Sequence, residues 1–239
     1  MTELLYQTDS YLKQFSAKIV GVDEEKHALL LDSTAFYPGG GGQPADSGTL
    51  TADSSRMAVK RARKKGQEVW HTIADDTPLA TVGTLIEGEI DWERRYQLMR
   101  THSAMHVLCG TIFRDYGAKV TGGEMESLKA RMDFEFETLT KDLVKIIEDS
   151  INIEAAKAHP LNVSILPREE AFLIPDLIRT KINLLPPQIT EVRVVEIVGL
   201  DIQADGGTHV RNTSEIGKIR VVNYKSKGKI NKRLYVELD

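Results

Sequence analysis

The stretch from Asp91 to Gly117 most constrains what this chain can fold into. Its apolar residues recur at close to helical period, Asp91 is suited to cap a helix and Gly117 to end one. We therefore expect a helix of about seven turns, at roughly 3.6 residues per turn. Because the preceding chain reads as strands and turns, we place a domain boundary just before Asp91. The predicted domains are residues 1–90 and 91–239.

Two histidines lie near the middle of this predicted helix, and a second donor pair lies far downstream. His102 and His106 are four residues apart, so their Cβ atoms should be about 5–6 Å apart on one helix face. The segment ADGGTHV repeats that spacing with Asp205 and His209. An HxxxH pair alone is more often two surface or core histidines. Four donors from two segments, however, favour the tetrahedral site that Zn²⁺ prefers.

The surrounding residues restrict what such a site could be. The metalloprotease signature HExxH is absent, because Ser103 stands where its glutamate would be. Cys109 lies about 10 Å along the helix axis from His102, so one ion cannot bind both of them and His106. We interpret Cys109 as a packed apolar residue. Four protein ligands normally make a closed structural site, so catalysis would need Asp205 to bind weakly or yield to substrate.

Before Asp91, short apolar runs are separated by polar and glycine turns, which favours a small β-barrel. The segments AKIVGV and HALLLD suggest a hairpin, and RMAVKRARKK, EVWHTI and VGTLIEGEID suggest further strands. Four consecutive glycines, Gly39 to Gly42, exclude a helix between them. They predict a loop with unusual φ values or one that lets another backbone approach closely. The alternative is a flexible hairpin tip.

After Gly117 the pattern mixes helices with antiparallel strands, so the predicted class is α+β. We expect a turn at Gly122–Gly123, a strand with Ala130, Met132 and Phe134 on one face, and a helix over KDLVKIIEDSINIEAAKAH. LNVSILP should be a strand, REEAFLIPDLI a short helix broken at Pro175, and VRVVEIVGLDIQADGGTHV one strand leading into the second donor pair. The C-terminal segment should form a hairpin with SKGK at its tip.

That hairpin carries a run of basic residues without an acidic one, on a chain whose net charge is −4. It is a candidate phosphate contact. The alternative is a solvated hairpin whose lysines prevent edge pairing. The candidate phosphate-binding residues are Lys225, Lys227, Lys229, Lys232 and Arg233.

Composition narrows the cellular setting. Hydrophobic content of 41% and charged content of 28% are typical of a globular protein. The single cysteine excludes an intramolecular disulfide and fits a reducing compartment. The first residues lack a secretory signal pattern, and no apolar run approaches the length of about 18 residues that spans a membrane. We expect a cytoplasmic protein with no membrane partner.

Several motifs together resemble the AlaX family, the stand-alone homologues of the alanyl-tRNA synthetase editing domain. They are the HxxxH of His102 and His106, the GGTHV that ends at Val210, AFYPGGGGQPADSGTL from Ala35, and KARMDF from Lys129. They occur in the family's order and cover most of the chain.

The resemblance implies an N-terminal β-barrel followed by an α+β zinc-binding editing domain that holds one Zn²⁺ per chain. The implied metal ligands are His102, His106, Asp205 and His209, where Asp205 replaces the usual cysteine. The implied catalytic residues are Thr34, His102 and His209, and Thr34 would contact a serine hydroxyl. The implied substrate-binding residues are Thr34, Gly122, Gly123 and Gln203.

The implied activity is hydrolysis of the ester in mischarged tRNA(Ala), mainly Ser-tRNA(Ala) and also Gly-tRNA(Ala). Selecting serine over alanine requires a site that hydrogen-bonds the hydroxyl, because a pocket that holds serine also admits alanine. Two other functions stay open. One is an editing-domain relic that binds tRNA without catalysis, and the other is a zinc hydrolase for small esters or amides.

Overall fold

The computed structural model describes residues 1–53, 55–74, 77–180, 185–187 and 189–239. Its chain divides into two compact units, Met1–Tyr96 and Gln97–Asp239. The first therefore includes the opening turn of helix α1 (Trp92–Tyr116). The predicted α+β class, with a barrel first and a long helix after it, is confirmed.

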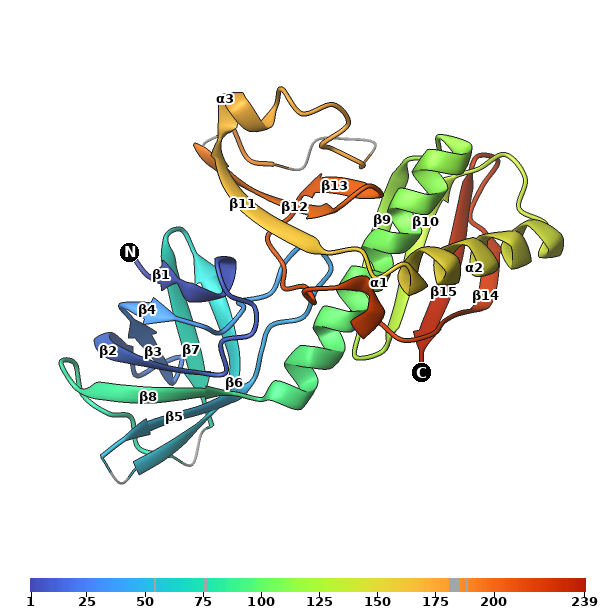
Figure 1. Ribbon diagram of the computed structural model, residues 1–239. Coiled ribbons are helices and arrows are strands. Elements are labelled where there is room, and N and C mark those ends of the chain that lie inside the picture. The colour runs from blue at the N-terminus through green and yellow to red at the C-terminus, as the bar shows by residue number, and fades with distance from the viewer. Residues whose placement is uncertain (54, 75–76, 181–184, 188) are drawn as a thin grey trace. The chain divides into compact units, whose positions relative to one another are not determined.

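The first unit is a closed six-stranded barrel of strand order β2-β3-β7-β6-β5-β8 (Figure 1). Alternate side chains fill its interior, among them the fully buried Leu29, Leu50 and Met57. The predicted hairpin is confirmed, since β2 and β3 pair antiparallel. The first unit also contains a short parallel pair, β1 (Glu3–Leu4) with β4 (Ser33–Thr34), and the 3-10 helix η1 (Leu5–Gln7). The barrel strands are β2 (Gln14–Asp23), β3 (Ala28–Leu31), β5 (Gly48–Ala52), β6 (Ser55–Lys65), β7 (Glu68–Ile73) and β8 (Leu85–Ile90).

The glycine run is an ordered loop with unusual backbone angles. All four residues from Gly39 to Gly42 have positive φ, between 57° and 133°. The hydroxyl of Tyr37 donates to the Gly40 carbonyl over 2.9 Å. At the loop's base, the backbone N–H of Tyr37 donates to the buried Asp46 carboxylate, which also pairs with the fully buried Arg95 of α1. The prediction of unusual φ values is thus confirmed.

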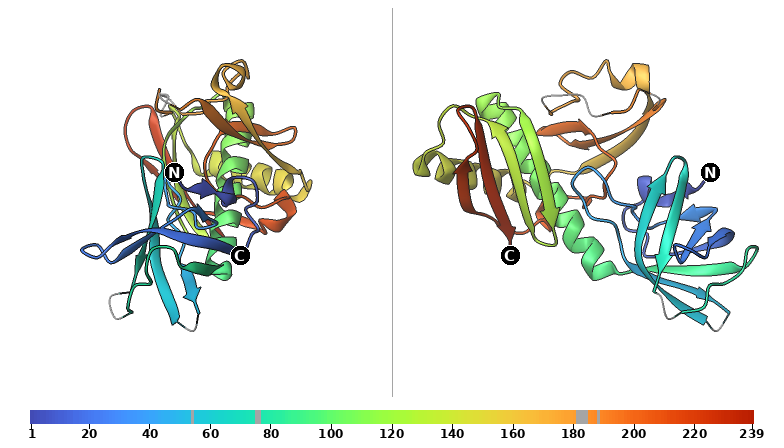
Figure 2. Two further views of the ribbon diagram at one scale, coloured as in Figure 1. Left: turned by 90° about the vertical axis from the view of Figure 1, so that its left-hand side faces the viewer. Right: turned by 180° about the vertical axis from the view of Figure 1, so that it is seen from behind.

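The second unit contains a four-stranded antiparallel sheet of order β14-β15-β10-β9 and a separate three-stranded sheet of order β11-β12-β13. Figures 1 and 2 show α1 and α2 on the same face of the larger sheet. The 3-10 helix η2 (Thr213–Glu215) follows β13. The helices are α2 (Lys141–Ala156) and α3 (Arg168–Ala171); the strands are β9 (Val120–Glu126), β10 (Lys129–Glu135), β11 (Leu161–Pro167), β12 (Glu191–Ile197), β13 (Asp201–Ala204), β14 (Ile219–Ser226) and β15 (Asn231–Leu238).

The predicted turn at Gly122–Gly123 is wrong. Both glycines lie inside β9, opposite Asp133 and Met132 of β10, and the chain reverses instead near Leu128, whose φ is +62°. A Cβ on Gly123 would lie 3.0 Å from the Met105 methyl of α1. The glycine therefore permits close approach of helix to sheet, which is one use of glycine inside a strand.

The single strand predicted before the second donor pair is also wrong. It is a hairpin, with β12 and β13 antiparallel and Gly199 at a φ of +78° in the turn. The short helix α3 ends at Ala171, ahead of Pro175. By contrast, the predicted bounds of α1 and the C-terminal hairpin are confirmed. The predicted second helix is also present as α2, but it ends at Ala156, three residues before the predicted end at His159.

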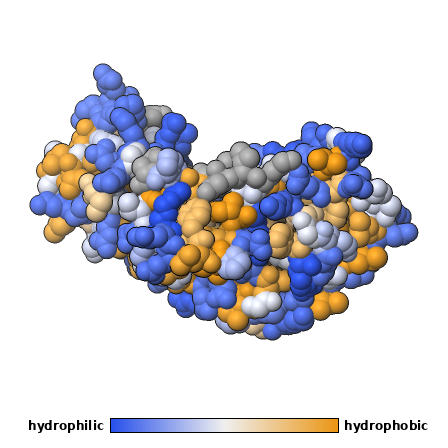
Figure 3. Space-filling model, turned by 90° about the horizontal axis from the view of Figure 1, so that it is seen from above, coloured by the Kyte–Doolittle hydropathy of each residue, from blue (hydrophilic) through white to orange (hydrophobic). Residues whose placement is uncertain are grey.

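The surface on the face seen in Figure 3 is largely hydrophilic, with hydrophobic residues in smaller groups among the polar ones. Among the described residues, no helix has the length and apolar character needed to cross a membrane.

Candidate metal centre

Helix α1 carries two of the four predicted ligands on its buried face. His102 and His106 are each 4% exposed, and their ring centroids are 5.2 Å apart. Their spacing of one helical turn aims both imidazoles at the loop that follows β13.

That loop carries the other two ligands and is held from two sides. The carboxylate of Asp205 accepts the backbone N–H of Gly207 over 2.7 Å. The guanidinium of Arg193, on β12, donates to the carbonyls of Asp205 (3.0 Å) and Gly207 (2.8 Å). The backbone N–H of Val210, next to His209, donates to Ser103 of α1 over 3.2 Å. The loop is therefore pre-ordered by contacts within the second unit.

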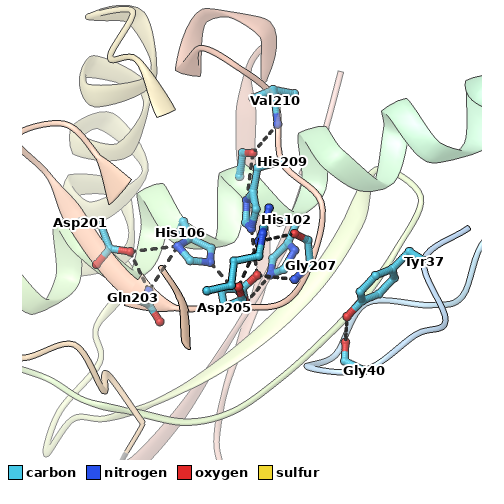
Figure 4. A network of polar contacts seen from close by, with 12 residues as sticks. Tyr37, Gly40, His102, His106, Asp201, Gln203, Asp205, Gly207, His209 and Val210 are labelled. Atoms are coloured by element: carbon cyan, nitrogen blue, oxygen red, sulfur yellow. Dashed lines mark hydrogen bonds and ion pairs between the residues drawn. The ribbon is translucent and has the colours of Figure 1, made fainter. Parts of the chain in front are cut away.

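The four side chains converge in a group that could hold a metal ion (Figure 4). Their ligand atoms all lie within 4.8 Å of one another. Asp205 Oδ2 is 3.4 Å from His102 Nε2 and 3.8 Å from His106 Nε2, and Asp205 Oδ1 is 3.0 Å from His209 Nε2. Bonds of about 2.0 Å to a tetrahedral ion would separate neighbouring ligand atoms by about 3.3 Å. The spacing and the donor chemistry both fit such an ion.

A second carboxylate, missed in the sequence, orients His106. Asp201 Oδ2 lies 3.1 Å from His106 Nδ1, so a proton on Nδ1 is donated to it and Nε2 stays available to a metal. Asp201 is itself held by Gln203 Nε2 (2.6 Å) and Arg179 Nε (3.2 Å). Asp201 and Gln203 lie two residues apart on one face of β13, and Asp205 follows at the same spacing in the loop after the strand. That spacing is the signal that could have identified Asp201.

Burial and mutual charge shift the pKa values of three residues in this group. Burial lowers the pKa of His106, but hydrogen bonds to Asp201 and Asp205 outweigh it and raise that pKa to about 9. Burial raises the pKa of Asp205, yet the charge of His102 and hydrogen bonds from the imidazoles hold it well below its usual range. Burial, together with His102, lowers the pKa of His209. Without a metal, the Asp205 carboxylate is therefore ionised and His209 is neutral, whereas His106 holds a second proton that ligation through Nε2 has to displace.

The thiol of Cys109 lies outside this group. It is 1% exposed, and burial raises its pKa well above the ordinary value. The interpretation of Cys109 as a packed apolar residue is thus consistent with its surroundings in α1.

The remaining predicted site residues lie in different places. Thr34 is fully buried in the first unit, where its hydroxyl lies 2.8 Å from His71 Nε2 and accepts the Phe36 N–H over 3.1 Å. Contact with a substrate would require Thr34 to exchange these partners, and its role stays a prediction. Gly122 and Gly123 are strand residues of β9, and Gln203 supports Asp201 next to His106.

The five basic residues of the C-terminal hairpin divide into two groups. Lys232 is buried and its ammonium donates to the carbonyls of Gly228 and Lys229, while Arg233 pairs through two nitrogens with Asp133. Exposed side chains remain at Lys225, Lys227 and Lys229.

Comparison with known proteins identifies the family. The alanyl-tRNA editing protein AlaX-M of Saccharolobus solfataricus is 42% identical over 238 residues, which are 98% of each chain. AlaX-M of Methanosarcina mazei is 38% identical over 244 residues, 100% of this chain and 97% of the relative. This chain belongs to the AlaX family. The predicted resemblance is confirmed.

Two domain families and a longer enzyme extend this result. The tRNA synthetases class II (A) family matches residues 8–94, and the threonyl and alanyl tRNA synthetase second additional domain matches residues 192–235, which include Asp205 and His209. An alanine–tRNA ligase of Saccharolobus islandicus is 36% identical over 230 residues, 93% of this chain but 25% of the ligase. As an AlaX family member, the chain is an enzyme, as predicted.

Proposed function

We propose that this AlaX protein hydrolyses the ester between serine and tRNA(Ala) in trans, at a zinc site formed by His102, His106, Asp205 and His209. The single observation that carries the proposal is this converged donor group in a chain that matches AlaX-M relatives along its full length. Hydrolysis of Gly-tRNA(Ala) is a second expected activity of the same site.

Zinc is the proposed ion because three imidazole nitrogens and one carboxylate oxygen suit its borderline character. When bound, it would supply Lewis acidity next to the ester. Asp205 is the ligand best able to yield, since its carboxylate is 16% exposed whereas the three histidines are more deeply buried. Its Oδ1 retains the Gly207 N–H, so the loop can keep its shape while Oδ2 moves.

The chain's own groups orient the site. Asp201 fixes the ring of His106, and Ser103 lies 3.4 Å from His209 Nδ1 while accepting the Val210 N–H. Both contacts direct the Nε2 atoms of these histidines toward Asp205. Fixed ligands of this kind lower the reorganisation that a reaction must otherwise include.

The direct test measures release of amino acid from Ser-tRNA(Ala) and Ala-tRNA(Ala) by the zinc-loaded protein. We expect serine release to exceed alanine release by several orders of magnitude, and His209→Gln to abolish it. His27→Gln, a histidine of the first unit whose ring bonds the Thr77 carbonyl, is the matched control and should remain active. Comparable hydrolysis of both substrates, or none from loaded protein, would refute the proposal.

Asp205 supports a second candidate, a tRNA-binding relic without catalysis, because aspartate stands where the family's usual cysteine is expected. Elemental analysis of the purified protein separates the two. A relic should lack stoichiometric zinc and release neither amino acid, yet still bind tRNA.

A further inference from the structure

The barrel carries a concentration of positive charge that the proposed site does not use. Strand β6 has no acidic residue, although the whole chain has a net charge of −4. Its basic side chains are all exposed. We call them the β6 stripe, which consists of Arg56, Lys60, Arg61, Arg63, Lys64 and Lys65.

Protection of a sheet edge does not explain these charges. Edge strands often carry lysines that prevent pairing with another chain. Strand β6, however, is paired on one side with β5 and on the other with β7 inside a closed barrel. The C-terminal hairpin differs, because β14 is an edge strand of its sheet and edge protection remains sufficient there.

The centre of the stripe is not neutralised by the protein. Arg56 lies 3.8 Å from Glu89, and Lys65 is close enough to Asp23 to contribute to the lowered pKa of that carboxyl. Within the described part of the chain, Arg61, Arg63 and Lys64 form no ion pair. These three cations are therefore available to an external anion.

Register places the two arginines on the outer face of the barrel. Arg61 is opposite Thr72 and Arg63 opposite Trp70, while Ala62 between them points inward. Same-face residues along a strand are about 6.8 Å apart, which lets neighbouring arginines reach different phosphates of one strand. The half-buried indole of Trp70 adds a flat surface of the kind on which a base can stack.

We propose that the β6 stripe binds the phosphate backbone of the tRNA, as an RNA contact surface of the barrel. This inference rests on the proposed function for the identity of its partner. The chemistry it commits to is a polyanion with regularly spaced charges, bound mainly through counterion release and hence sensitive to salt.

The test compares two variants with the same change in charge. The stripe variant carries Arg61→Gln, Arg63→Gln and Lys64→Gln. The control neutralises exposed lysines elsewhere, at Lys18, Lys26 and Lys145. Binding of uncharged tRNA(Ala) is measured between 50 and 200 mM salt, a range over which phosphate contacts cause about a 10³-fold or larger change in affinity for strongly electrostatic binders.

We expect the stripe variant to bind roughly tenfold or more weakly and to lose about 3 from the slope of log K against log salt. Arg63→Gln alone should lose about 1, and the control should keep the wild-type slope. Unfolding curves that match wild type will establish that the stripe variant is folded.

A second measurement uses the two tryptophans of the chain. Trp92→Phe leaves Trp70 as the sole emitter, and addition of tRNA should change its fluorescence with the salt dependence of binding. Adding the stripe substitutions should move the midpoint to higher tRNA concentration.

The outcomes separate this inference from the proposed function. Suppose that the stripe variant and its control have equal affinity and salt slope, and that Trp70 emission does not change on adding tRNA. This result would refute the role of the β6 stripe in tRNA binding, even if Ser-tRNA(Ala) is hydrolysed. If tRNA binding depends on the β6 stripe but the wild-type protein hydrolyses neither substrate, the inference about the stripe stands and the proposed deacylase activity is refuted.

Discussion

Asp205 is the residue on which the chemistry of the metal centre depends most. It contacts all three histidine ligands and lies in the loop between β13 and η2. As a ligand, its carboxylate would be a harder donor than the cysteine thiolate that the family resemblance implies at this position, and the proposed site would combine nitrogen and oxygen ligands. Metal affinity is therefore the property in which a change at Asp205 should be seen first.

Asp205→Cys should keep or tighten zinc binding, because thiolate is a preferred zinc ligand. Asp205→Ala should weaken it by roughly 100-fold or more, since a direct ligand exceeds the 10–100-fold effect of an outer contact. Competition with a chromogenic chelator gives the affinities. Equal zinc content in wild type and both variants would show that the carboxylate is not a ligand.

Asp201→Asn tests the outer contact. The amide keeps the shape but loses the charge that stabilises a proton on His106 Nδ1, so we expect zinc affinity to fall by about 10–100-fold. Asp115→Asn, at the exposed end of α1, is the control and should bind zinc as wild type does. Unchanged zinc affinity in Asp201→Asn would show that Asp201 does not support metal binding by His106.

At the scale of elements, the packing of α1 against the β12–β13 hairpin brings the two ligand segments together. Gly110 lies in α1, where a Cβ would be 2.8 Å from Asp201 Cβ and 3.0 Å from the Leu200 carbonyl. Helix and hairpin can approach this closely only because position 110 has no side chain.

Gly110→Ala should therefore lower the free energy of unfolding by about 1–3 kcal/mol. This loss outweighs the gain of about 1 kcal/mol in helix propensity. Ser150→Ala, in α2, is the control and should be neutral or slightly stabilising. Urea unfolding measures both, and a stabilised Gly110→Ala would contradict the packing described.

Another buried carboxylate joins α1 to α2. Glu154 accepts hydrogen bonds from Arg114 (2.5 Å) and Lys157 (2.9 Å), and lies 3.0 Å from His159 Nε2. Burial raises the pKa of Glu154, but these three partners outweigh it and lower that pKa to about 2.

The lowered pKa of Glu154 decides how the stability of the fold changes with pH. Glu154 stabilises the fold above its ordinary pKa of 4.5, and that contribution is lost as the pH falls toward 2. Glu154→Gln should lower the free energy of unfolding by roughly 2 kcal/mol at pH 7. This difference from wild type should shrink as the pH falls below about 5. Denaturant unfolding across this range tests it, and a constant difference would exclude the carboxylate's charge as the cause.

At the scale of the whole molecule, the metal centre belongs to one unit. Every proposed ligand lies within Gln97–Asp239, so bound metal should stabilise that unit specifically. The expected gain is about 4 kcal/mol when free metal is 1,000 times its dissociation constant.

Removing the metal with a chelator should therefore raise hydrogen exchange in the central part of α1 and in the β12–β13 hairpin. Amides of the barrel strands should keep their protection. Readdition of zinc should restore the original pattern. Equal loss of protection in both units would show that the metal stabilises the chain as a whole.

The sequence by itself determined the features that local patterns encode. The bounds of α1, the β2–β3 and C-terminal hairpins, and the spacing of His102 and His106 follow from periodicity, capping and turn residues within short segments. The grouping of His102 and His106 with Asp205 and His209 was predictable because only a few residue types bind metal and both pairs have the same spacing. The family motifs added the expected substrate and activity.

Only the tertiary structure decided which partners the other side chains have. Asp201 lies in the second strand of a hairpin, within reach of His106. Gly123 pairs with Met132 inside β9, where a side chain would crowd Met105. Lys232 and Arg233 turned to internal acceptors rather than outward. Hydrogen bonds and packing between residues far apart in sequence select these arrangements, and no local period records them.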